Sequence, residues 1–147
     1  MEQEALIRIR SVQRRAGDEP DESELVTDGT FAAIGGGRRI DYDESELTGM
    51  EGTHTRFEVF PDHVILTRTG SLSSQMIFEV GRPHTSFYEL PFGALTVDVH
   101  TLSLRSRLGE RGGLVELRYD IVVEHEVVGE NDIRIQIKTK DNRGNAL

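Results

Sequence analysis

Alternation of apolar and polar side chains, repeated along most of the chain, is the feature that most limits how this sequence can fold. In the clearest run, Val115, Leu117, Tyr119, Ile121 and Val123 occupy every second position. A period of two residues places successive side chains on opposite faces of an extended strand, whereas a helix needs apolar residues three or four positions apart. Helical spacing never persists here beyond a turn or so. The sequence therefore predicts a fold made of strands.

The predicted strands follow one another through short turns. They cover about residues 4–15, 25–34, 38–43, 53–59, 64–70, 72–80, 84–90, 94–105, 115–123 and 133–138. Sequential hairpins bury only one face, so the sheet must close or fold onto itself. We therefore predict an all-β fold, a single antiparallel up-and-down β-barrel of about 8–10 strands, with a β-sandwich as the alternative.

Three local features refine this outline. Gly35, Gly36 and Gly37 predict a hairpin turn, because glycine readily supplies positive φ. Within residues 94–105, inward positions end at Val99 and resume with opposite parity at Leu102 and Leu104. One extra residue near His100 would return both leucines to the inner face, which predicts a β-bulge there.

Other segments are predicted to lie outside the strands. The stretch GDEPDESE, residues 17–24, combines glycine, proline and five carboxylates, which is typical of a solvated loop. A turn is expected at residues 129–132, and the tail DNRGNAL, about residues 141–147, is expected to fray. A chain of 147 residues suits one domain, residues 1–147.

Charge and composition exclude several classes of function. The formal net charge is −9, which opposes the electrostatic attraction on which nucleic-acid binding depends, so we expect no nucleic-acid partner. The absence of cysteine rules out disulfides, thiolate-bound metals and cysteine nucleophiles. No stretch approaches the ~20 apolar residues of a membrane helix, and the first residues lack a signal-peptide core. We expect a cytoplasmic protein without a membrane partner.

The order of several short motifs is similar to that of a known family. The motifs are Gly52-Thr53, Val64-x-Leu66-x-Arg68-x-Gly70, Phe78-x-x-Gly81, Tyr88-x-x-Pro91-Phe92-Gly93, the double glycine before Tyr119, and Asn131 before Ile133-x-Ile135. From the first strand to Lys138 this order resembles the YwiB-like family of small bacterial proteins. The resemblance implies a calycin-type barrel, related in shape to lipocalins, in a family of undefined role. The Gly-x-Trp opening of lipocalins is missing, so a secreted-carrier function is not implied.

Arg68 is the most informative polar residue. Alternation puts it on the same face as Val64 and Leu66, where an unpaired guanidinium would be costly. One interpretation is structural: Arg68 lies at the barrel mouth or pairs with an internal carboxylate. The other is functional: it anchors a ligand carboxylate or phosphate through its planar fork.

Two tyrosines complete the predicted ligand-binding set of Arg68, Tyr88 and Tyr119. Tyr119 lies on the apolar face of the clearest strand, where a buried hydroxyl needs a hydrogen-bond partner. Tyr88 occupies the strand that ends before the Pro91-Phe92-Gly93 break. Each is either a core residue with one hydrogen bond or a contact for a ligand, and the sequence leaves both readings open.

Motifs for catalysis, metals or cofactors are missing. The histidines are His54, His63, His84, His100 and His125, and none forms a short-spaced pair typical of zinc. Gly35 to Gly37 lead into a strand rather than the helix that a phosphate loop requires. Gly70-Ser71-Leu72-Ser73-Ser74 lacks the second glycine of a nucleophile elbow. We therefore predict no catalytic residue, no metal and no cofactor.

Three functional hypotheses remain open. The leading one is a non-enzymatic barrel that binds a small, partly apolar or anionic ligand, because barrels of this size can enclose one. The alternative is an interaction or assembly module with a packed, ligand-free barrel, for example a homodimer. A weaker alternative is an enzyme that uses histidines and carboxylates at the barrel mouth, with His100 and Arg68 as its test residues.

Overall fold

The computed structural model describes residues 2–15, 17–71, 73–90 and 93–140, with the backbone alone described at positions 47, 88–90 and 95. Within these ranges it contains ten strands and one short 3-10 helix. The strands are β1 (Glu2–Arg14), β2 (Asp21–Ile34), β3 (Gly37–Asp43), β4 (Thr53–Val59), β5 (Val64–Gly70), β6 (Ser73–Phe78), β7 (His84–Leu90), β8 (Gly93–Gly109), β9 (Gly112–Val123) and β10 (Glu126–Thr139); the helix is η1 (Glu46–Thr48).

The strands form a closed barrel with up-and-down topology. Each strand pairs antiparallel with the next along the chain, and β1 closes the barrel by pairing with β10. The shortest described pairing joins β6 to β7, where Ser73 pairs with Glu89 and Ser74 pairs with Tyr88. The predicted all-β, antiparallel up-and-down barrel is confirmed, and closure decides against the sandwich. No helix in the described part of the chain is long and apolar enough to span a bilayer.

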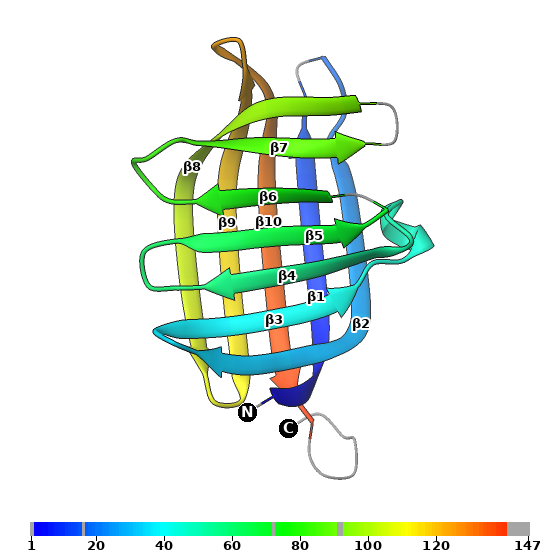
Figure 1. The fold of residues 1–147 in the computed structure, drawn as a ribbon, viewed down its shortest axis with the longest axis vertical. Coiled ribbons are helices and arrows are strands. Elements are labelled where there is room, and N and C mark those ends of the chain that lie inside the picture. The colour runs from blue at the N-terminus through cyan, green and yellow to red at the C-terminus, as the bar shows by residue number, and fades with distance from the viewer. Residues whose placement is uncertain (1, 16, 72, 91–92, 141–147) are drawn as a thin grey trace.

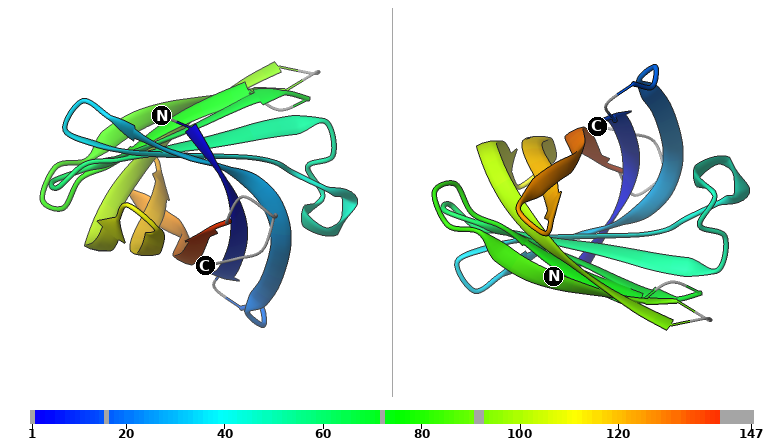
Figure 2. Two further views of the ribbon diagram at one scale, coloured as in Figure 1. Left: turned by 90° about the horizontal axis from the view of Figure 1, so that it is seen from below. Right: turned by 90° about the horizontal axis from the view of Figure 1, so that it is seen from above.

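The barrel is flattened into two layers. Strands β3 to β7 form one layer, and β8, β9, β10, β1 and β2 cross behind it at a steep angle (Figure 1). Seen along the barrel, the two layers face each other and the long strands β2 and β8 curve from one to the other (Figure 2). Gly29 lies in the curve of β2, where an added Cβ would be 2.2 Å from the carbonyl oxygen of Asp41. Glycine is therefore needed for this close approach of two backbones.

The space between the layers contains the apolar core. Phe31, Phe57 and Phe78 are its largest fully buried side chains. Ile133 and Ile137 of β10 belong to the same cluster, as their alternation predicts. Because both layers contribute their inward-facing positions, each strand buries one face and leaves the other in water.

The predicted hairpin and bulge are both found. Ile34 pairs with Gly37, and Gly36 adopts a φ of +81° in the turn between them. The register of β8 against β9 shifts between Thr101 and Ser103, which is the predicted bulge. However, Leu102 is the extra residue and is 54% exposed, so its predicted inward position is wrong. The bulge turns Leu102 outward and so restores the inner face for the residues beyond it.

The loop predicted at residues 17–24 ends earlier than expected, because β2 begins at Asp21. Its carboxylates lie opposite arginines of β1: Glu24 contacts Arg8 at 3.3 Å and Glu22 contacts Arg10 at 3.7 Å. Cross-strand pairs of opposite charge make this exposed, acidic segment compatible with a strand. Composition alone gave the wrong prediction because it ignores the partner strand.

Two further predictions about turns and burial are wrong. The last hairpin turns at Glu124 and His125, which both have positive φ, and not at residues 129–132, which belong to β10. A two-residue turn with positive φ at both positions matches the twist of the flanking strands. The strand predicted over residues 72–80 ends early, because β6 stops at Phe78, and Val80 beyond it is 55% exposed rather than buried. The tail at residues 141–147 lies outside the described residues.

Candidate functional site

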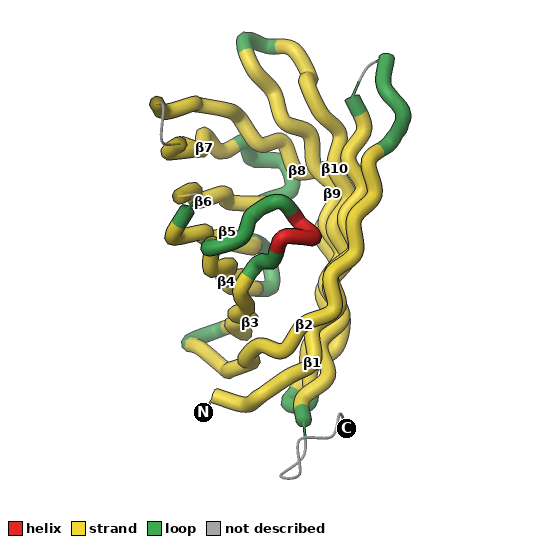
Figure 3. The backbone as a smooth tube through the Cα atoms, turned by 90° about the vertical axis from the view of Figure 1, so that its right-hand side faces the viewer, coloured by secondary structure: helices red, strands yellow, loops and turns green. Residues whose placement is uncertain are grey.

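A cavity of about 740 Å³ lies inside the barrel, between the two layers. Its apolar lining comes mostly from the core, with Ile9, Leu25, Phe57, Met76, Tyr119 and Ile133 among its residues. Its lining also includes Thr48 of η1, Met50 just after η1, and Arg14 and Asp21 at the ends of β1 and β2. Figure 3 shows η1 between the layers, at the side of the barrel. The volume falls in the range of about 300–1,000 Å³ that is usual for small-molecule sites.

A row of polar residues runs across neighbouring strands on the inner face of one layer, and two of its members, Tyr42 and Arg68, line the cavity. The strand registers align Tyr42 of β3 with Thr55 of β4, Thr55 with Arg68 of β5, and Arg68 with Ser74 of β6. Directly opposed residues in antiparallel strands point to the same face. We call these four residues the inner polar row. The opposite wall, from β1, β2, β9 and β10, is largely apolar near Ile9, Leu25 and Ile133.

Arg68 is the charged member of the inner polar row, and it lines the cavity. Its Nε is shielded from solvent and has no hydrogen-bond partner. In the described part of the chain, no ion pair joins its guanidinium to a carboxylate. A buried donor left without a partner costs about 1–3 kcal/mol, and more when it is charged. Arg68 thus has at least one buried donor that the described part of the fold leaves unsatisfied.

Glu44 also lines the cavity, and it holds η1 against the barrel. Its carboxylate is 8% exposed and accepts hydrogen bonds from the hydroxyls of Thr48, at 3.0 Å, and Thr55, at 2.6 Å. Its backbone N–H donates to the carbonyl oxygen of Thr53 at 2.9 Å. These bonds join the segment before and within η1 to β4. Glu44 therefore has a structural role at the mouth of the cavity.

Tyr42 is buried beside Glu44. Burial raises the pKa of its phenol well above the ordinary value, and the negative charge of Glu44 raises it further, while the positive charge of Arg68 acts in the opposite direction. Tyr42 consequently keeps its hydroxyl proton at neutral pH. The inner polar row thus offers hydroxyl donors beside the guanidinium of Arg68, and no ionised tyrosine.

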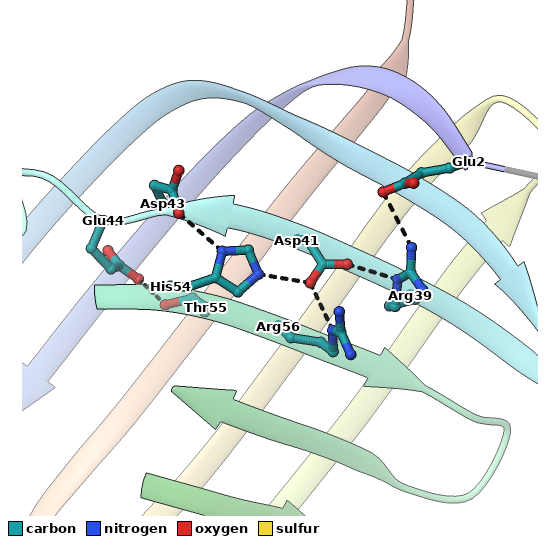
Figure 4. Close-up of polar contacts among 8 residues, drawn as sticks. All are labelled: Glu2, Arg39, Asp41, Asp43, Glu44, His54, Thr55 and Arg56. Carbon is teal, nitrogen blue, oxygen red and sulfur yellow. Dashed lines mark hydrogen bonds and ion pairs between the residues drawn. The ribbon is translucent and has the colours of Figure 1, made fainter. Parts of the chain in front are cut away.

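The outer face of β3 and β4 carries a separate charged cluster, shown in Figure 4, which we call the Asp41 network: Arg39, Asp41, Asp43, His54 and Arg56. The Asp41 side chain is 7% exposed and contacts Arg39 and Arg56 at 2.7 Å and His54 at 2.9 Å. The contacts of Asp41 with Arg56 and His54 are hydrogen bonds. The contact between Arg39 Nε and Asp41 Oδ2 is an ion pair without hydrogen-bond geometry. The second ring nitrogen of His54 lies 2.9 Å from Asp43.

The pKa values in the Asp41 network shift as this pairing requires. Burial acts to raise the pKa of Asp41, but the hydrogen bonds from Arg56 and His54 outweigh it, and the pKa is lowered. The pKa of His54 is raised, first by its hydrogen bond with Asp43 and then by that with Asp41. The network therefore favours a protonated imidazole and an ionised carboxylate, which is a structural arrangement and leaves no group free for chemistry.

The structure brings two of the three residues of the predicted ligand-binding set to one cavity. Arg68 and Tyr119 both line it, and the ring of Tyr119 packs on that of Phe78 at 4.6 Å between centroids. The backbone of Tyr88 pairs with Ser74 across β6 and β7, but the side chain of Tyr88 lies outside the described residues. His100 is exposed and lies opposite Asp120 on the outside of the barrel. It shares no site with Arg68.

Sequence reasoning missed Tyr42 and Glu44, which line the cavity, and Ser74, which lies opposite Arg68. Tyr42 has the same parity as Ile40, so alternation already contained the signal that it faces inward. Ser74 likewise shares the parity of Met76. Glu44 gave no such signal, because it follows β3 in an acidic segment. In the described ranges, no group of three histidine, aspartate or glutamate side chains is placed to hold a metal ion.

Comparisons with known proteins agree with this fold. A family model described as "Domain of unknown function (DUF1934)" matches residues 7–135. The crystal structure of the ywiB protein from Bacillus subtilis is similar to this chain with a TM-score of 0.84 and 21% sequence identity, covering 95% of this chain and 94% of that chain. At this identity the likeness shows the fold alone. The family match and the shared fold together confirm the resemblance to the YwiB-like family. No curated protein matches the chain.

Proposed function

The chain belongs to the family described as Domain of unknown function (DUF1934), and we propose that it is a non-enzymatic, calycin-like barrel that binds a small, partly apolar ligand in the cytoplasm. The single observation that carries the proposal is the cavity of about 740 Å³ between the two layers. Protein interiors are normally close-packed, with few voids larger than a water molecule. A space of this size inside a core is expected where a ligand fills it.

The two walls of the cavity support a ligand that is partly apolar. Leu25 and Ile133 offer apolar surface on one side, while Arg68 and Tyr42 offer polar groups on the other. Small-molecule sites commonly combine a mostly apolar lining with a few placed polar groups. Burial of the apolar part of a ligand would supply binding energy at about 25 cal/mol per Å² of buried apolar area.

Native mass spectrometry of the purified protein and titration with the neutral dye Nile red test the proposal. We expect a retained small molecule, or saturable binding of the dye by the emptied protein. Ile133→Phe would replace an aliphatic side chain of the cavity wall with a larger aromatic one and should weaken dye binding. The matched control is Val26→Phe, because Val26 is 49% exposed on β2 and should leave binding unchanged. A protein that retains no molecule and binds no dye would rule the proposal out.

The alternative function, an interaction or assembly module, places the important surface outside the barrel. The exposed Val80 forms an isolated bridge with Thr101, next to the exposed Leu102. A second copy would cover such apolar side chains. A packed interior, which this alternative assumes, is harder to reconcile with the cavity, so ligand binding is the leading proposal. Size-exclusion chromatography that shows only monomers would count against a homodimer.

A further inference from the structure

We propose that the ligand carries one anionic group, a carboxylate or a phosphate, on an apolar body, and that Arg68 and Ser74 hold this group. The inference rests on the proposed binding function of the cavity and specifies the chemistry of its occupant. Ser74 is included because it lies beside Arg68 and because its hydroxyl is buried without a hydrogen-bond partner.

Two unpartnered donors lie side by side in the inner polar row. Arg68 and Ser74 are directly opposed in the register of β5 and β6, so their Cβ atoms are expected about 4.5–5.5 Å apart on the same face. The Nε of Arg68 and the Oγ of Ser74 are both shielded from solvent and both lack a hydrogen-bond partner. An oxyanion placed between them would accept one hydrogen bond from each.

Arg68 has no carboxylate partner in the described part of the chain. Glu44, which also lines the cavity, accepts hydrogen bonds from the hydroxyls of Thr48 and Thr55 and forms no ion pair with Arg68. The guanidinium of Arg68 is therefore open to an anionic group. Arginine binds carboxylate and phosphate groups through its planar fork of N–H donors. A ligand with a positive head would instead meet repulsion here.

The remainder of the cavity suits an apolar body attached to such a head. Met76, two positions from Ser74, and Tyr119 both line the same cavity, as do Leu25 and Ile133 on the opposite layer. A head held at the Arg68–Ser74 pair would therefore direct the rest of the ligand across the interior toward these apolar side chains. The chain as a whole carries a net charge of −9, which repels anions at long range. An anionic ligand would therefore have to be held by the local donors of Arg68 and Ser74.

Isothermal titration calorimetry with three ligands of equal chain length tests the inference. Decanoate, decyl phosphate and decanol are each titrated into the wild-type protein. The two anions are kept below their critical micelle concentrations, and decanol is kept below its solubility limit. We expect at least one of the two anions to bind about 10- to 100-fold more tightly than decanol, which is the effect of a charge-assisted hydrogen bond. Comparison of the two anions identifies the head group. Equal affinity for decanol and both anions would overturn the inference.

Variants locate the effect. Arg68→Met should remove the preference for the anions and leave decanol affinity nearly unchanged, and Ser74→Ala should reduce the preference by a smaller factor. Arg105→Met is the control for the first variant, since Arg105 is exposed on β8. Ser86→Ala is the control for the second, because the Ser86 hydroxyl is also buried and unpartnered but lies opposite Val97 rather than Arg68. An anion preference that survives in Arg68→Met contradicts the proposed site.

The two proposals fail in different ways. If Nile red and decanol bind in the cavity but the anions show no preference, the barrel binds ligands and only the anion site is wrong. If neither the dye nor any decyl compound binds, the binding function fails and the anion site with it. Circular dichroism of each variant confirms that it is folded, and the comparison of ligands on the wild-type protein needs no variant.

Discussion

On the outer face of β3 and β4, Arg39, His54 and Arg56 all contact Asp41 at 2.7 to 2.9 Å. On the inner face of the neighbouring strand β5, Arg68 lines a cavity without a described carboxylate partner. The two positions lie on opposite faces of one sheet, two strands apart. The outer arginines have carboxylate partners within the fold, whereas the inner one has none among the described residues.

The comparison teaches how one sheet can combine stability with binding. A charge that is paired within the protein contributes to folding, and a charge that is left unpaired in a cavity costs folding free energy. Such a cost is commonly found at binding sites, where function and stability trade off. We call the Asp41 network the paired side of the sheet and the inner face at Arg68 its unpaired side. Mutations on the two sides are therefore expected to change stability in opposite directions.

The largest effect is expected at the centre of the paired side. Asp41→Asn removes the carboxylate that three cationic side chains share, and it should lower the free energy of unfolding by about 2 kcal/mol. This value is below that of a fully buried ion pair because Arg56 and His54 are partly exposed. Urea denaturation measures it. Asp43→Asn is the matched control, since Asp43 is 86% exposed, and it should cost less than about 0.5 kcal/mol. Equal losses in the two variants would contradict the central role of Asp41.

The unpaired side should respond in the opposite direction. Arg68→Met replaces an unpartnered guanidinium with an apolar side chain of similar length, so the ligand-free protein should gain about 1 kcal/mol of unfolding free energy. The same denaturation experiment on Arg105→Met should give a change within about 0.5 kcal/mol. A clear loss of stability in Arg68→Met would mean that Arg68 has a structural partner and that the contrast between the two faces is false.

The smallest effect concerns pH and the paired side alone. The pKa of His54 is raised in the folded protein, so its contribution to stability is complete below its ordinary pKa of about 6.5 and is lost as pH rises through the raised value. The wild-type protein should therefore lose stability relative to His54→Gln as pH rises above about 6.5. Because His54 is 42% exposed, solvent screening keeps the difference below about 1 kcal/mol. Parallel pH profiles of the two proteins would show that the network does not depend on the imidazolium.

Much of the inner surface could be predicted from the sequence because side-chain alternation is a local property. Arg68 was placed inside by its parity with Val64 and Leu66, and the structure puts it in the cavity wall. Tyr119 follows the same rule. The bulge of β8 was predicted from a change of parity, although Leu102 proved to be the residue that turns outward. The extra residue of a bulge depends on the partner strand, which the local pattern does not contain.

The parts that escaped prediction depend on contacts between distant segments. The acidic residues Glu22 and Glu24 form a strand because Arg10 and Arg8 lie opposite them. Glu44 reaches the cavity only because hydroxyls of η1 and β4 fix its carboxylate. The pairing of Arg68 with Ser74 required the register of β5 against β6, since the two residues are six positions apart along the chain and lie on different strands.

By itself, the sequence determined that this chain forms antiparallel strands with one apolar face and that an arginine stands on that face, because the direction of each side chain along an extended backbone depends on its position alone. Only the tertiary structure decided that the two layers leave a cavity, that Ser74 stands beside Arg68, and that Asp41 and its partners satisfy one another on the outside. These properties follow from strand register and from the distance between layers, and both are set by the packing of residues far apart in the chain.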